Sequence, residues 1–291
     1  STHANTYIDN TSSSDGWKYV EASGSGGSPF SFIFDYTLLF GGSGVSSGDM
    51  IQYFIVAQDN AGSPNVAINS GSFNVTPLSV GLNSTHFPIG GSINSFNIIP
   101  AGLSGTKTIG AAGDYATITG TGGLFEAINN SGLSANVTAN IIDASVTETG
   151  TVALNNINYN GCASGPYSLT IKPNTTSTLT GSVGAGAVIK LNGADNVVID
   201  GSNSGGTDRS LTIQNLTTTT TGNAVIWLAA PALGNGANNN TIKNCIIEGN
   251  AATTTFLGAY VGGSTSISLT TAGSDQNNNN SFQNNLFRKT Q

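Results

Sequence analysis

Short stretches of alternating apolar and polar residues fill the chain from residue 134 to residue 291, and no helical pattern interrupts them after Leu133. Gly, Asn and Thr residues separate the stretches. Parallel strands in α/β proteins are joined by crossover helices, which are missing here. A parallel arrangement must therefore arise from coiling of the chain itself. We predict a parallel β-helix, a solenoid of stacked coils, over residues 107–291.

Four phrases within this region resemble one another in their placement of Asn, Asp and apolar residues. They are "ADNVVIDGSN" (194–203), "RSLTIQNLT" (209–217), "NNNTIKNCIIEGN" (238–250) and "NNNSFQNNLF" (278–287). Equivalent positions of stacked coils lie about 4.8 Å apart, so aligned asparagines can hydrogen-bond from amide to amide along the stack. A buried Asn without partners would cost about 1–3 kcal/mol. The Asn runs therefore predict a ladder that satisfies these amides.

Residues 122–133, "GGLFEAINNSGL", carry the one convincing helical pattern of the chain. Leu124, Phe125 and Ile128 lie on one side of this helix, and Gly132 is expected to end it. A single amphipathic helix before a run of short strands can cover the open end of a stacked β structure. We therefore predict a short capping helix.

Residues 1–77 follow another pattern, with longer alternating stretches divided by Gly, Ser and Pro. This spacing is typical of a β-sandwich. An immunoglobulin-like sandwich needs about seven strands, whereas this region offers only five. Either the chain begins inside a domain, or a strand from another molecule completes the sheet. We predict an incomplete immunoglobulin-like sandwich with Trp17 in its core, followed by a linker over residues 78–106.

Charged residues make up only 8% of the chain, and the formal net charge is −7. The 8 Lys and Arg residues are spread thinly, so no basic stripe can neutralise phosphates, and nucleic acid is not expected as a partner. The longest apolar run, Ala224–Leu233, contains Pro231 and is about half as long as a membrane-spanning helix. No membrane span is expected.

Two cysteines, Cys162 and Cys245, are too few for a disulfide framework. The apolar alternation around Cys245 favours two small buried thiols. The alternative is a bridge between them, which would constrain the unfolded chain by roughly 4 kcal/mol. The two histidines, His3 and His86, lie far from both cysteines in sequence, so nothing marks either thiol as a nucleophile.

Several stretches resemble one family of bacterial proteins. They are residues 48–77, 89–98, 113–142, 189–203 ("IKLNGADNVVIDGSN") and 238–249 ("NNNTIKNCIIEG"). The chain resembles large secreted or cell-surface proteins of Bacteroidota and related bacteria, in which an immunoglobulin-like module precedes a right-handed parallel β-helix of the pectate-lyase-like kind. The resemblance implies an all-β fold, a secreted or cell-surface location, and a segment of a long modular protein.

Pectate-lyase-like helices often carry carbohydrate-active sites, which use paired carboxylates or a basic residue with calcium. Asp195 and Asp200 are five positions apart, which puts them on opposite faces of an extended strand, and Asp200 is expected to cap a turn. Lys190 and Arg209 could serve a lyase, but solvated surface charges explain them as well. The remaining acidic residues stand singly, among them Asp143, Glu148, Asp208 and Glu248. We predict no catalytic, cofactor-binding or metal-binding residues.

Glycans are a further candidate partner. Exposed aromatic residues along a groove, such as Tyr260 or Trp227, would favour glycan binding, although Trp227 in "AVIWLAA" is expected to be buried. The Thr217–Thr221 run is expected to form a loop between strands. Asn-x-Ser/Thr triplets permit glycosylation but arise by chance in a chain this rich in Asn and Thr; they include Asn74, Asn83, Asn136, Asn174 and Asn215.

These features together predict a non-enzymatic extracellular building block of a bacterial surface. It could be a filament subunit completed by strand donation from a neighbour, with self-association or neighbouring domains of a longer chain as its partners. Two alternatives stay open: a carbohydrate-active β-helix enzyme, and a glycan-binding adhesin without catalysis. Two carboxylates in one groove would favour the enzyme.

Overall fold

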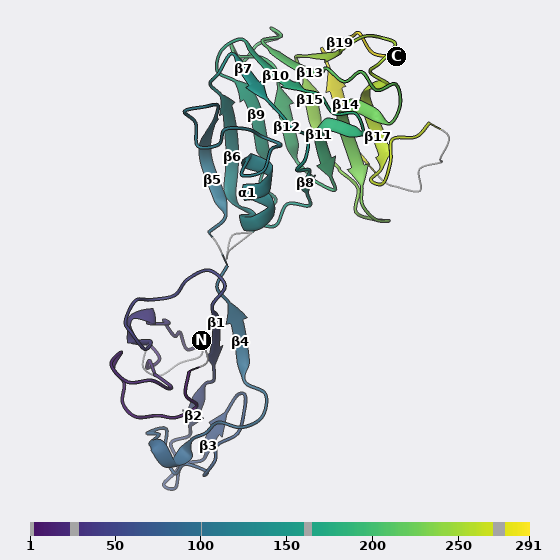
Figure 1. Cartoon of the computed structure of the whole chain (residues 1–291). Coiled ribbons are helices and arrows are strands. Elements are labelled where there is room, and N and C mark those ends of the chain that lie inside the picture. Colours follow the sequence, from purple (N-terminus) through teal and green to yellow (C-terminus); the bar gives the residue numbers. More distant parts are fainter. Residues whose placement is uncertain (1–2, 24–28, 100, 160–164, 270–276) are drawn as a thin grey trace. The chain divides into compact units, whose positions relative to one another are not determined.

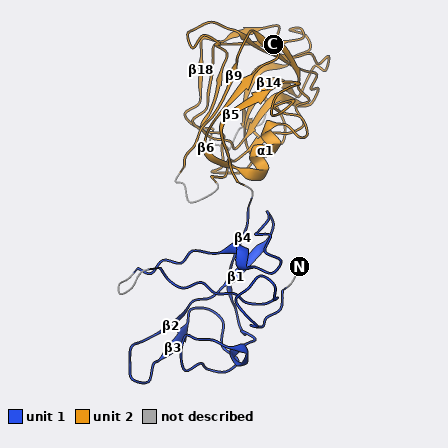
Figure 2. Ribbon diagram, turned by 90° about the vertical axis from the view of Figure 1, so that its left-hand side faces the viewer, with its two compact units in different colours: residues 1–99 blue, residues 100–291 orange. Residues whose placement is uncertain are grey.

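The computed structural model describes residues 3–23, 29–99, 101–159, 165–269 and 277–291. The chain forms two compact units, Ser1–Ile99 and Pro100–Gln291 (Figure 2), here called the N-terminal unit and the solenoid unit. Residues 78–106, expected as a linker, are divided between them. They contain strand β4 (Asn94–Asn97) and the first part of β5 (Leu103–Ile109).

The solenoid unit consists of three parallel sheets, and consecutive strands of the chain from β6 onward enter the sheets in turn (Figure 1). The six-stranded sheet holds β5, β6 (Leu133–Ile141), β9 (Leu169–Pro173), β12 (Val197–Asp200), β15 (Thr241–Lys243) and β18 (Ser281–Gln283). The five-stranded sheet holds β7 (Ser145–Thr147), β10 (Ser177–Gly181), β13 (Leu211–Asn215), β16 (Cys245–Gly249) and β19 (Leu286–Arg288). The four-stranded sheet holds β8 (Leu154–Asn155), β11 (Gly186–Asn192), β14 (Asn223–Ala230) and β17 (Leu257–Gly263). The predicted parallel β-helix is confirmed, with about five turns.

Apolar side chains stack in register from coil to coil and form the core. In the six-stranded sheet, Val137, Leu169 and Val197 occupy equivalent positions, and in the five-stranded sheet Leu179 lies beside Ile213. All of them are buried. Successive residues of a strand point to opposite faces of the sheet, so the alternation in the sequence separates this core from the polar outer surface.

One helix, α1 (Leu124–Ser131), precedes the first full coil. Its side chains Leu124, Phe125 and Ile128 are buried in the solenoid core, and the helix packs against β5 and β8, the first strands of two sheets (Figure 1). Gly132 ends it with a φ of 66°, a conformation that glycine adopts without strain. The predicted capping helix is confirmed. None of the helices in the described residues has the length and hydropathy to cross a membrane.

Asparagines occupy the tight turns before and after strands of the six-stranded sheet. Asn196, Asn239 and Asn279 lie just before β12, β15 and β18 with φ values of 57–59°. Asn244 and Asn284 follow β15 and β18 with φ values of 56° and 49°. Asn tolerates this left-handed conformation better than most other residues. The backbone of the turns therefore explains part of the Asn repetition in the sequence.

Asparagine side chains also bind the backbone of the preceding coil. Asn280 Oδ1 accepts the N–H of Asn240 at 2.9 Å, and Asn280 Nδ2 donates to the carbonyl oxygen of Ala237 at 2.7 Å. Asn240 repeats this one coil earlier, with the N–H of Val197 at 2.8 Å and the carbonyl of Ala194 at 2.9 Å. Each side chain thus satisfies two backbone groups at a turn, where the sheet ladder ends.

Direct amide-to-amide bonds, as expected from the sequence, occur at fewer positions. Asn284 Nδ2 donates to Asn244 Oδ1 at 2.8 Å, and Asn192 Nδ2 donates to Asn155 Oδ1 at 2.9 Å. Some of the stacked asparagines therefore form a ladder of side-chain amides. More of them bridge to backbone groups that the turns would otherwise leave without a partner.

The N-terminal unit has much less regular structure. Its described residues contain two small antiparallel sheets: β1 (Met50–Tyr53) pairs with β4, and β2 (Val56–Gln58) pairs with β3 (Val66–Ile68). These residues also contain two short 3-10 helices, Tyr36–Leu38 and Ser84–His86, and isolated β-bridges that join Ser23 to Ser31 and Ser72 to Gly90. The all-β prediction is confirmed, whereas an immunoglobulin-like sandwich is not shown by these sheets.

Candidate functional site

The outer face of the four-stranded sheet is covered by side chains of the unit itself. All eight residues of β14 are buried, whereas β13 alternates between buried and half-buried residues. Trp227 and Ile267 belong to a second apolar cluster, against which Tyr260 packs. The rings of Trp227 and Tyr260 meet edge to face, with their centroids 5.9 Å apart. The expectation that Trp227 is buried is confirmed, since only 4% of the residue is exposed.

A groove of about 430 Å³ lies beside this cluster. We call it the sheet groove. Among the described residues that line it, only Lys190 is charged. The lining residues are Gly150, Thr151, Ala153, Ala185, Gly186, Ala187, Lys190, Gly222, Trp227, Ser264, Thr265, Ser266 and Ile267. They come from several coils, so the groove depends on the coil register.

Lys190 lies across the indole ring of Trp227. The two residues are register partners on β11 and β14, and Lys190 Nζ is 3.8 Å from the ring centroid, a cation–π contact. Lys190 Nζ also donates to the carbonyl oxygen of Ser264 at 2.8 Å, and Trp227 Nε1 donates to that of Gly263 at 3.0 Å. Burial lowers the pKa of Lys190. Trp227 therefore holds the end of β17, and Lys190 holds the residue that follows it.

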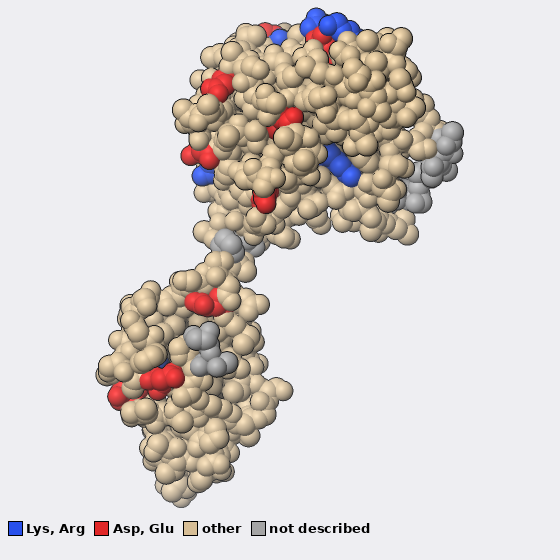
Figure 3. All heavy atoms as spheres, in the orientation of Figure 1, with Lys and Arg blue, Asp and Glu red and all other residues tan. Residues whose placement is uncertain are grey.

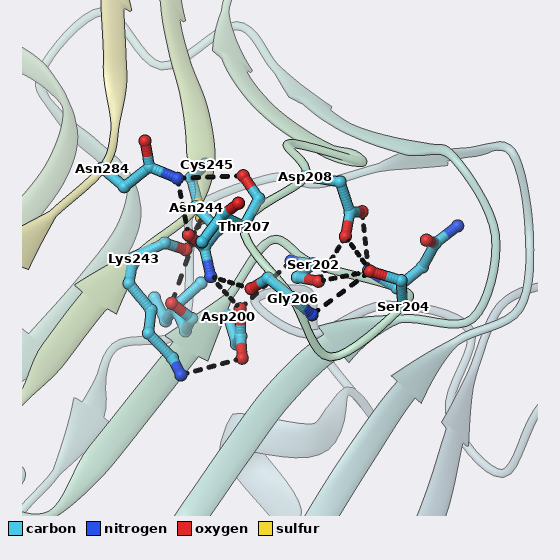
Figure 4. Close-up of polar contacts among 12 residues, drawn as sticks. Asp200, Ser202, Ser204, Gly206, Thr207, Asp208, Lys243, Asn244, Cys245 and Asn284 are labelled. Carbon is cyan, nitrogen blue, oxygen red and sulfur yellow. Dashed lines mark hydrogen bonds and ion pairs between the residues drawn. The ribbon is translucent and has the colours of Figure 1, made fainter.

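A polar loop, residues 201–210, joins β12 to β13 (Figure 4). Asp208 accepts hydrogen bonds from the hydroxyls of Ser202 at 2.5 Å, Ser210 at 2.7 Å and Ser204. These hydroxyls lower the pKa of Asp208. Asp200 Oδ1 accepts the N–H of Ser202 at 3.1 Å, which confirms its expected role in the turn. The contacts of Asp208 stabilise the loop itself.

The same region ties three coils together through polar side chains (Figure 4). Asp200 pairs with Lys243 at 3.1 Å and accepts a hydrogen bond from Asn244 at 2.9 Å. Burial would raise the pKa of Asp200, but the hydrogen bonds from Asn244 and Ser202, with the charge of Lys243, outweigh burial and lower it. Arg209 donates to Asn284 Oδ1 at 2.6 Å. Arg209, interpreted from the sequence as a solvated charge, is therefore exposed but bound to the last coil.

Other carboxylates each bind a different part of the backbone. Glu148 is buried and accepts the N–H groups of Ile118 and Thr119 at 2.8 and 2.7 Å, which fastens the segment before α1. Asp143 accepts the N–H of Ala111 at 2.7 Å. Asp195 accepts the N–H of Asn238 at 2.6 Å; burial raises its pKa against the opposing effect of Asn238.

Glu248, on β16, forms an ion-pair cluster with the last coil. Its Oε2 is 2.5 Å from Arg288 Nη2, and its Oε1 is 2.6 Å from Lys289 Nζ. Burial would raise the pKa of Glu248, but Lys289 and Arg288 outweigh burial and lower it. Among the described residues, no group of three or more His, Cys, Asp and Glu side chains could hold a metal ion.

Cys245 is a free and fully buried thiol. Burial, reinforced by the charge of Asp200, raises its pKa to about 12, so it is protonated at neutral pH. Cys162 lies outside the described residues. Asn215, one of the candidate glycosylation sites, is buried and donates to the carbonyls of Val183 and Ala224 at 3.0 and 2.9 Å. Its amide is part of the core.

The sequence pointed to Lys190 and Trp227 separately but did not show that they meet. The available signal was a single lysine in the apolar stretch "AVIKLNG", where a charge calls for an explanation. Most of the surface in view carries no charge (Figure 3), as expected for a chain with 8% charged residues. Comparison with protein-family models, with curated proteins and with solved structures gives no match.

Proposed function

We propose that this chain is a non-enzymatic structural and adhesive building block of a bacterial surface, and a segment of a secreted or cell-surface protein of the kind that its sequence resembles. The stacked coils suit a stalk, because each coil pairs along its sheets with the next and is bridged to it by asparagine side chains. The observation that carries the proposal is the apolar surface that the N-terminal unit leaves exposed.

The described residues of the N-terminal unit bury only three apolar side chains, Pro77, Phe87 and Ile89. A domain of about 100 residues normally buries most of the surface that its unfolded chain exposes. The segment 29–34, "PFSFIF", instead presents alternate and adjacent apolar side chains to solvent, and its single β-bridge joins Ser31 to Ser23. Its exposed large residues are Phe30, Phe32, Ile33 and Phe34.

A strand from a neighbouring subunit would complete this unit. Added strands bind through main-chain hydrogen bonds and place alternate side chains in apolar pockets, and pairing removes the hazard of an open edge. In this proposal the N-terminal unit is the immunoglobulin-like module of the family, and repeated donation between copies builds a filament. The adhesive role then follows from display of many solenoid units along one fibre.

Catalysis is left out of the proposal because the acidic side chains of the solenoid unit serve separate structural contacts. Glu148 holds the segment before α1, Asp200 holds a turn, and Glu248 holds the last coil. A glycoside hydrolase would need two carboxyl groups within about 5–9.5 Å in one cleft. None of the described residues that line the sheet groove carries a carboxylate.

Electron microscopy and sedimentation of the full chain test this proposal. We expect regular fibres, and slow amide hydrogen exchange over residues 29–34 within them. Ile33→Asp should prevent assembly, because it puts a charge into the strand-binding surface. Leu233→Asp is the matched control: Leu233 in the solenoid unit is 77% exposed and Ile33 is 76% exposed. Monomers with a self-contained N-terminal unit, or equal loss of fibres in both variants, would overturn the proposal.

A further inference from the structure

The sheet groove contains a half-buried cation that forms no ion pair with any described residue. The ion pairs formed by described residues involve His3, Lys18, Lys243, Arg288 and Lys289. Lys190 is not among them, and none of the other described residues that line the groove is charged. Removing an ammonium group from water is costly unless another charge or dipole compensates.

The existing contacts of Lys190 compensate only part of this cost. Its ammonium group has three hydrogen-bond donors, of which one binds the carbonyl of Ser264. The indole ring of Trp227 lies 3.8 Å away and attracts the charge through its π electrons. Donor capacity therefore remains on a cation that is held in place from two sides. Such a fixed cation favours an anionic group in the groove.

Hydroxyl groups and small residues make up most of the rest of the lining. Thr151, Ser264, Thr265 and Ser266 can donate and accept hydrogen bonds, while glycines and alanines leave space beside them. The volume of about 430 Å³ falls within the range of small-molecule sites, roughly 300–1,000 Å³. Trp227 is buried beneath Lys190, so its ring offers no free stacking platform. Recognition here would depend on charge and hydroxyl groups.

We propose that the sheet groove binds an acidic saccharide. Its carboxylate or sulfate pairs with Lys190 Nζ, and its ring hydroxyls exchange hydrogen bonds with the threonine and serine hydroxyls of the lining. The charge-assisted bond to Lys190 supplies the selectivity for acidic over neutral sugars, because bonds with one charged partner are about twice as strong as neutral ones. This site is independent of the N-terminal unit and of its assembly.

Titration calorimetry with three sugars of one ring size tests the proposal on the full chain. Glucuronate carries a carboxylate, glucose 6-sulfate carries a sulfate, and glucose differs from both mainly in having neither. We expect at least one acidic sugar to bind about tenfold more tightly than glucose, which is the discrimination that one charge-assisted bond provides. Added salt should weaken the binding of the acidic sugar and leave the binding of glucose unchanged.

Lys190→Met should remove this selectivity, because the affinity for the acidic sugar should fall about tenfold, to the affinity for glucose. Lys190→Arg should retain more of the selectivity. Lys172→Met is the matched control: Lys172 is a half-buried lysine on strand β9 of the same unit and lies outside the groove. The Lys172→Met variant should bind the acidic sugar with an affinity within about twofold of that of the parent chain. Binding of both acidic sugars no tighter than that of glucose, absence of binding, or equal loss in both Met variants would each overturn the proposal. The salt dependence of the parent chain decides the case if Lys190→Met fails to fold.

Discussion

The two units share a polar, weakly charged composition, but they bury their apolar residues to very different extents. In the solenoid unit, residues such as Leu169 and Ile213 are fully buried between neighbouring coils. In the N-terminal unit, equally apolar residues such as Ile33 face solvent. Alternation of apolar and polar residues is present in both. Alternation therefore yields a core only where another strand layer covers the apolar face.

The largest difference between the units is expected for an aromatic side chain. Phe125→Ala removes a fully buried ring and should destabilise the solenoid unit by about 3–5 kcal/mol. Phe30→Ala removes a ring that is 57% exposed in the N-terminal unit and should change the stability of the monomer by only about 0.5 kcal/mol. Urea unfolding of both variants, followed by circular dichroism, measures this. Similar losses of unfolding free energy in both variants would contradict the difference in burial between the units.

A smaller effect is expected from the asparagine bridges. Asn240→Ala leaves the N–H of Val197 and the carbonyl of Ala194 without their side-chain partner, and should cost about 1–3 kcal/mol. Asn156→Ala, at an exposed position of the same unit, serves as the control and should stay within about 0.5 kcal/mol. If the two substitutions were equally mild, the bridges would not explain the order of the solenoid unit.

The smallest effect should appear on acidification. The pKa of Glu248 is lowered from 4.5 in the folded chain, so its ion pairs add stability above about pH 4.5, and this contribution is lost as pH falls through the folded pKa. Because Arg288 and Lys289 are about half exposed, the contribution is expected to be at most about 1 kcal/mol. Glu248→Gln should abolish this part of the pH dependence in thermal unfolding curves. An unchanged pH profile in that variant would assign the acid sensitivity to other carboxylates.

The fold of the solenoid unit could be predicted because its determinants are local. Strand alternation, the helix ended by Gly132 and the Asn turns all appear within a few residues of sequence. The sheet groove could not be predicted in the same way. Lys190 meets Ser264, 74 residues later, and this contact depends on the lengths of every loop between β11 and β17. The sequence of an uncharged loop contains no pattern from which the alignment of Lys190 with Ser264 could be predicted.

The strands of the last two coils pair at an offset of 40 residues, from Thr241 with Ser281 to Glu248 with Arg288. Between other neighbouring coils the offset ranges from 28 residues, from Leu169 to Val197, to 43 residues, from Val198 to Thr241. Loop length therefore varies from coil to coil while the strands stay in register. Insertions into these loops should enlarge the outer surface of a coil at little cost to the core beneath it.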